Sequence, residues 1–192
     1  TVYNDAVCKF RKPETSDLIL KPNSLALIVT RKIKSNSFSH ALAVRYPPEV
    51  ICLSPQTSCN AYVFPVLSDS ENQIDLENVN RYFSQRNIMF RDSPDTGETG
   101  SKIKYGSKDL LGWVYAILFS ESYRKKFARQ LSFDFPKIPL PHDEEEFVKL
   151  SKLGNRLIEI HTAENLNLWM RKESNCVDIE DNQPDRGIPI KK

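Results

Sequence analysis

Side chains able to perform acid–base, nucleophilic or metal chemistry are few and widely spaced in this chain. The histidines His40, His142 and His161 lie far apart, and none has a neighbouring Cys or Ser in an activating position. A nucleophilic triad would therefore depend wholly on tertiary geometry. Three consecutive glutamates stand at residues 144–146, at the start of an expected helix, where their charge complements the positive end of the helix dipole. The pattern favours structural roles for these residues over catalysis.

Two short motifs that resemble catalytic signatures do not meet the chemical requirements of those signatures. Gly97 and Gly100 are separated by two residues before Lys102, whereas a phosphate-binding P-loop needs four residues between its glycines. Residues 46–49 read Tyr-Pro-Pro-Glu, which reverses the Asn/Asp-Pro-Pro-Tyr/Phe order of amino-methyltransferases and lacks the Asn or Asp that binds an exocyclic amine. We interpret this second motif as a turn.

Composition indicates a soluble globular protein rather than a membrane or secreted one. The chain has 192 residues, 40% of them apolar, and contains neither an uninterrupted apolar span nor a signal peptide. Its start at Thr1 favours a fragment of a longer polypeptide. The four cysteines form no C-x-x-C pair, which makes zinc and redox sites weak interpretations and isolated thiols in a reducing cytoplasm the better one. They are Cys8, Cys52, Cys59 and Cys176.

The distribution of charge is more informative than the net charge of +2. Basic residues gather between residues 101 and 129, and a second polar, basic segment directly follows an apolar run. Hydrogen-bond donors on such basic segments, when rigid elements hold them in place, can contact DNA phosphates and base edges. Each cluster can equally be an ordinary solvent-exposed surface. The candidate DNA contacts are Arg31, Lys32, Lys34, Asn36, Lys102 and Lys104, with Arg124 and Lys125 as weaker phosphate contacts. No metal ligands are expected.

Four apolar runs in the first third of the chain have the composition of β-strands. They cover residues 24–32, 40–46, 49–53 and 60–67. The connections are too short for parallel crossovers, which need about a dozen residues, so antiparallel pairing is expected. The sequence therefore predicts an α+β fold, with a small antiparallel or mixed sheet in the N-terminal half followed by a cluster of helices.

Helical periodicity follows the strands. A short helix over residues 75–85, capped by Asp75, precedes a polar loop over residues 91–106. The next helix begins at Ser107 as its N-cap, another covers residues 121–131, and a third starts near Asp143. The apolar stripe of this third helix is Phe147, Leu150, Leu153, Leu157 and Ile160.

We expect one domain over residues 1–192. Its parts are a β-rich part (1–74), a short helix and mobile loop (75–106), a helical part (107–166) and a loosely ordered tail (167–192).

Residues 104–141, KYGSKDLLGWVYAILFSESYRKKFARQLSFDFPKIPLP, carry the most distinctive motifs of the chain. A capped aromatic helix is followed by Tyr123-Arg124 and then by Phe-Pro-Lys-Ile-Pro at residues 135–139, while residues 62–65 end the strand series as Tyr-Val-Phe-Pro. In these features the chain resembles the C-terminal specificity region of type ISP restriction-modification enzymes. The matched pieces cover about residues 24–65 and 104–161, and the family often has Arg where Lys137 stands.

The resemblance implies a DNA sequence-recognition domain that positions methyltransferase and motor/nuclease modules on a short asymmetric duplex target. The parent would then be a DNA adenine methyltransferase and restriction endonuclease that uses S-adenosylmethionine, ATP and Mg, whereas this fragment would have no catalytic residue and no cofactor. Its partners would be double-stranded DNA and the adjacent methyltransferase domain.

The family motifs are expected to be mainly structural. Trp113, Tyr115, Tyr123 and Phe127 would be core, and residues 135–141 would lock the helices against the sheet. The alternative function is a non-catalytic scaffold that docks the methyltransferase domain through its aromatic helices.

Overall fold

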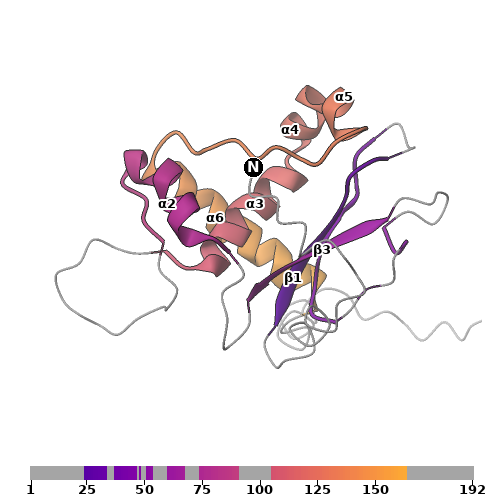
Figure 1. The fold of residues 1–192 in the computed structure, drawn as a ribbon, viewed down its shortest axis with the longest axis horizontal. Helices are drawn as coiled ribbons and strands as arrows, with labels where there is room; N and C mark the ends of the chain where they lie inside the picture. The colour runs from indigo at the N-terminus through magenta and orange to yellow at the C-terminus, as the bar shows by residue number, and fades with distance from the viewer. Residues whose placement is uncertain are drawn as a thin grey trace, which may run out of the picture.

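The computed structural model describes residues 24–33, 37–46, 48, 51–53, 60–67, 74–90 and 105–163. Within these residues, a small antiparallel sheet is followed along the chain by helices, two of which pack on it (Figure 1). The α+β fold predicted from the sequence is confirmed. None of the helices in the described part combines the length and apolar character that a membrane span requires.

The sheet has three strands in the order β2-β1-β3. The central strand β1 (Leu25–Thr30) pairs antiparallel with β2 (Ala41–Val44) and with β3 (Ala61–Leu67). Every residue of β1 is buried, because its alternate side chains enter two different apolar clusters on the two faces of the sheet. The predicted strands 24–32, 40–46 and 60–67 are confirmed in shortened form.

Five α-helices follow the sheet along the described part of the chain. They are α2 (Leu76–Phe83), α3 (Ser107–Phe119), α4 (Glu121–Lys126), α5 (Ala128–Leu131) and α6 (Glu144–His161), and the 3-10 turn η1 (Ser84–Arg86) extends α2. Asp75 caps α2 as predicted, and Asp143, near which a helix start was expected, caps α6. Their carboxylates accept hydrogen bonds from the backbone N–H of Asn78 at 3.0 Å and of Glu146 at 2.8 Å. Each bond satisfies a helix-start donor that would otherwise lack a partner.

The main core lies between one face of the sheet and the helices α3 and α6. Leu27 and Val29 of β1 meet Leu111 and Tyr115 of α3 there, with Ile158 from α6. A second cluster joins α2 to the other end of the helix pair. It contains Phe83, Ile88, Phe90, Tyr105, Trp113 and Phe147. The predicted core positions Trp113, Tyr115 and Tyr123 are buried, and Phe127 is partly buried.

The predicted strand at residues 49–53 is wrong over its described part, because residues 51–53 form a turn. Both edges of β1 are already paired with β2 and β3, and Leu53 instead packs over Ala26, Ile28 and Val63 on the outer face of the sheet. Leu53 thus serves as a cover for the sheet rather than as part of a strand, while Ile51 is exposed.

Two helix boundaries also differ from the prediction. The N-cap of α3 is Gly106 rather than Ser107, and the Asp109 carboxylate accepts from the Gly106 N–H at 3.0 Å. The single helix expected over residues 121–131 breaks at Phe127, whose φ of −107° and ψ of 17° are not helical. The break divides the run so that α4 buries Tyr123 while α5 buries Leu131.

The apolar stripe predicted for α6 is only partly buried. Phe147 is in the core as expected, but the other buried positions are Ser151, Gly154 and Ile158. Leu153 and Ile160 are instead exposed. Small residues face α3 because the two helix backbones approach closely at that point.

The proline-rich segment after α5 ties the helices to the sheet as expected. The ring of Phe135 packs edge-on against Tyr62 of β3 at 5.0 Å between ring centroids. Trp113 Nε1 donates to the Pro139 carbonyl at 3.2 Å, and the Tyr123 hydroxyl donates to the Lys137 carbonyl at 2.9 Å. These bonds fix the position of the segment that carries Lys137. The tail predicted at residues 167–192 lies outside the described residues, as does the loop predicted at residues 91–106 except for its last two residues.

Candidate nucleic-acid interface

The end of β1 brings two of the predicted DNA contacts against the turn that follows α5. Arg31 and Lys32 are both exposed, and the next residue, Ile33, donates its N–H to the Ser132 carbonyl at 3.2 Å. Arg31 Nε lies 3.8 Å from Asp134 Oδ1, and the guanidinium carbon lies 5.9 Å from the centre of the Phe135 ring. The structure therefore joins the β1 end to the α5 region.

Arg124 is held by the fold itself. Its Nε donates to the Leu118 carbonyl at 2.6 Å, and the guanidinium lies over the Phe119 ring at 4.7 Å from the ring centre. Burial lowers the pKa of this guanidinium. These interactions give Arg124 a structural role within the fold. Contact between Arg124 and a DNA phosphate stays a prediction.

Lys125 extends from α4 and forms an ion pair with Glu121 one turn earlier, at 2.6 Å between Nζ and Oε1. Both side chains are largely exposed, so the pair is weak and leaves Lys125 able to exchange partners. The other four predicted contacts lie outside the described residues. They are Lys34, Asn36, Lys102 and Lys104.

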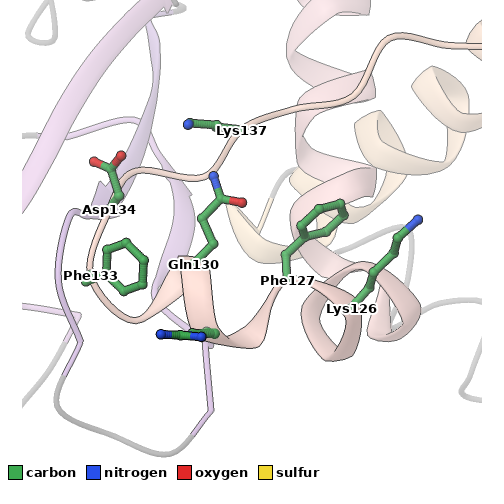
Figure 2. A pocket seen from close by; sticks show the side chains of 7 residues that line it. Lys126, Phe127, Gln130, Phe133, Asp134 and Lys137 are labelled. Atoms are coloured by element: carbon green, nitrogen blue, oxygen red, sulfur yellow. The ribbon is translucent and has the colours of Figure 1, made fainter.

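Beside Arg31 and Asp134 the surface forms a hollow of about 450 Å³. We call it the α5 hollow. It is lined by Lys126, Phe127, Arg129, Gln130, Phe133, Asp134 and Lys137. Figure 2 shows Gln130 in the middle of the labelled side chains, between Phe133 and Phe127, with its amide directed toward the segment that carries Lys137.

The α5 hollow concentrates positive charge that the protein itself does not neutralise. Within the described residues, Lys126, Arg129 and Lys137 have no carboxylate partner, and all three are exposed. The one acid of the hollow, Asp134, lies near Arg31. Phe133 adds an aromatic ring that is 55% exposed. Cations beside an amide and an exposed ring provide groups for phosphate binding and for base contact.

Several residues of the hollow were absent from the contacts predicted from the sequence, although a pattern for them exists. Lys126, Arg129, Gln130 and Phe133 follow the i, i+3, i+4, i+7 spacing of one helix face. Lys137 joins them from the proline-rich segment, and no local periodicity indicates its position. The grouping depends on the break at Phe127 and on the turn after Leu131.

Comparison with known families identifies the chain. The model of the type ISP C-terminal specificity domain matches residues 1–189. This chain belongs to that family. No curated protein sequence matches it.

Two solved structures resemble the type ISP specificity domain described here. One is a DrdV–DNA complex determined by cryo-electron microscopy, with a TM-score of 0.52 and 20% identity over 72% of this chain. The other is a nuclease-deletion mutant of the type ISP restriction-modification enzyme LlaGI in complex with a DNA substrate mimic, with a TM-score of 0.44 and 19% identity over 72% of this chain. The chain spans 12% of the DrdV chain and 10% of the LlaGI chain. The likeness to DrdV supports the fold.

Proposed function

We propose that this specificity domain binds duplex DNA and reads a short asymmetric target, so that the methyltransferase and motor/nuclease modules of a parent enzyme act at the right site. The observation that carries the proposal is the unpaired positive charge of the α5 hollow next to Arg31 and Lys32. The DrdV structure, which is a complex with DNA, has the same fold over most of this chain. Family membership and surface charge therefore point to the same ligand.

In this proposal, cations position the protein on the duplex and polar side chains supply sequence selectivity. Lys and Arg contacts to phosphates contribute affinity that depends on salt, and they carry no sequence information. Arg31 and Lys32 lie on the described surface, while Lys34, Asn36, Lys102 and Lys104 remain proposed contacts from the sequence. The domain itself supplies binding without chemistry, in the cytoplasm, and the adjacent methyltransferase domain of the same polypeptide is its second partner.

A salt titration with a charge-reversal pair tests DNA binding. Reversing Arg31 and Lys32 to Glu should weaken binding to a fluorescein-labelled duplex and flatten its salt dependence, because phosphate contacts are lost. The matched control reverses Lys149 and Lys152, two exposed lysines of α6, to Glu and makes the same change in net charge. Circular dichroism checks that both variants fold. A wild-type affinity that does not change with salt would contradict phosphate docking.

A second candidate function is the scaffold role, and an apolar groove between α3 and α6 favours it. The groove has a volume of about 370 Å³ and includes Ala116, Phe119, Leu150 and Leu157. Its rim carries Leu153 and Ile160, which are 50% and 46% exposed. The aromatic side chains of Trp113, Tyr115 and Tyr123 on the neighbouring helices are buried. This apolar groove is therefore the surface that a neighbouring methyltransferase domain would cover.

Substitution of the groove separates scaffolding from DNA reading. Changing Leu153 and Ile160 to Lys should release a separately purified methyltransferase domain in a pull-down assay if the groove is the docking surface. The Arg31/Lys32 reversal should leave that association intact. The opposite pattern, in which only the charge reversal releases the domain, would assign the basic surface to docking.

A further inference from the structure

We infer that the α5 hollow is a base-reading site of the proposed DNA-binding surface. In this inference Gln130 bonds the edge of an adenine while Lys126, Arg129 and Lys137 hold phosphates on either side. The inference rests on the proposed function. It adds that Gln130 reads the base, that the three cations position it, and that the base is adenine.

Gln130 differs in chemical character from the other residues that line the hollow. It is the one uncharged polar side chain lining the hollow, and it stands among the three unpaired cations. Within the described part of the chain, the side-chain amide of Gln130 has no hydrogen-bond partner from another side chain or from the backbone. The backbone carbonyl of Gln130 accepts from the N–H groups of Phe133 and Asp134. The backbone is thus held by the turn while both ends of the amide remain available to a ligand.

The chemistry of the amide selects the base. A glutamine side chain both donates and accepts, which matches the N7 acceptor and N6 donor of adenine in the major groove. The exposed Phe133 ring lies in the same hollow and fits the methyl group of thymine by apolar contact. Together the two side chains favour A·T pairs at the point where the hollow meets the duplex.

The surrounding cations explain why this amide would reach a base at all. Phosphate contacts fix the register of a protein on DNA, and base contacts then act from that fixed frame. Lys126 and Arg129 come from α4 and α5, and Lys137 comes from the segment that Trp113 and Tyr123 hold by hydrogen bonds. Three cations on separately anchored elements thus line the same hollow as Gln130, so small rotations of one element do not release the strand.

The experiment uses the complete polypeptide in which this chain occurs and a library of labelled duplexes with a randomised centre. Wild-type protein selects the preferred sequence, and variants are then compared on that duplex and on single-base changes of it. Gln130→Glu keeps the shape of the side chain but removes its donor, which suits the N4 donor of cytosine in place of adenine. Lys126→Ala and Lys137→Ala remove single cations, with Lys152→Ala on α6 as the matched control.

We expect Gln130→Glu to lose roughly ten- to hundredfold in preference for adenine at one position, while the other positions of the sequence stay unchanged. Lys126→Ala and Lys137→Ala should weaken binding to all duplexes alike and lower the salt slope by about one each. If the wild type selects a sequence but Gln130→Glu selects the same one, the inference is overturned and the proposed function stands. A wild type that does not bind the library would overturn both.

Discussion

Gly112 of α3 and Gly154 of α6 lie against each other with backbone facing backbone. A Cβ atom added at Gly154 would collide with the Gly112 carbonyl and would lie 3.0 Å from the backbone nitrogen of Ala116. A Cβ atom at Gly112 would collide with the Ser151 carbonyl. The two helices that support the sheet therefore pack closely because both positions lack a side chain.

Replacing Gly154 by Ala should destabilise the domain by about 3 kcal/mol, at the upper end of the cost of overpacking. The obstructing atoms are backbone, so rotation of a side chain cannot relieve the collision. Gly106→Ala is the control, because a Cβ there meets nothing closer than an Asp109 oxygen at 4.0 Å. Urea denaturation measures both variants. Equal unfolding midpoints for Gly154→Ala and the wild type would show that the helices can separate without cost.

The elements that local chemistry determines were predictable from the sequence. Strand β1 is a continuous apolar run that is buried on both faces, and Asp75 and Asp143 cap helices because each is an oxygen acceptor before a helical stretch. The anchoring of residues 135–141 followed from family motifs, and the bond from Trp113 to the Pro139 carbonyl shows how it works. These features depend on neighbours along the chain or on a specific motif.

The features that depend on distant contacts were not predictable in this way. The apolar period of α6 indicated Leu153 and Ile160 as core, whereas contact with Gly112 turns Ser151 and Gly154 toward α3 instead. The α5 hollow also needs the break at Phe127 to form. Hydrophobic periodicity identifies the apolar face of a helix, but it does not predict which face packs closely enough to bring two helix backbones into contact.

Tyr115 connects the sheet to both long helices through its hydroxyl group, which accepts from the Ala43 N–H at 3.2 Å and shares a hydrogen bond of 2.6 Å with His161 Nδ1. Tyr115→Phe leaves the Ala43 N–H without that acceptor, so a loss of about 1–3 kcal/mol in unfolding free energy is expected. Tyr82→Phe, at a residue that is 54% exposed, should change stability by less than about 0.5 kcal/mol. Chemical denaturation of the two variants side by side makes the comparison, and equal losses would contradict a structural role for the hydroxyl.

Stability should fall at alkaline pH because two tyrosines resist ionisation in the folded state. Burial raises the pKa of Tyr115 to about 12, and burial together with the Glu144 hydrogen bond raises the pKa of Tyr105 to about 12. The unfolded chain releases these protons near pH 10, so the folded state binds more protons between pH 10 and 12 and becomes less stable as pH rises through this window. Thermal melts over this range measure the loss. Tyr115→Phe should show a shallower decline than the wild type, and identical slopes would remove Tyr115 as a cause.

Arg124 and Lys125 are neighbours in sequence that should respond differently to removal. Arg124→Ala removes the bond to the Leu118 carbonyl and the stacking on Phe119. The substitution also removes the Nη2 atom of Arg124, which is buried without a hydrogen-bond partner in the described structure, and this offsets part of the loss. A net loss of about 1–2 kcal/mol in stability is therefore expected. Lys125→Ala should cost less than about 0.5 kcal/mol, because its pair with Glu121 is exposed.

DNA binding by the same two variants decides between the structural and the phosphate-binding roles of Arg124. If the guanidinium is occupied within the fold, Arg124→Ala should keep the wild-type salt slope at a temperature where the variant is fully folded, and Lys125→Ala should lower it by up to about one. Urea melts fix that temperature before the titration. A reduced slope for Arg124→Ala, with stability unchanged, would show that its side chain leaves the Phe119 ring to reach phosphate.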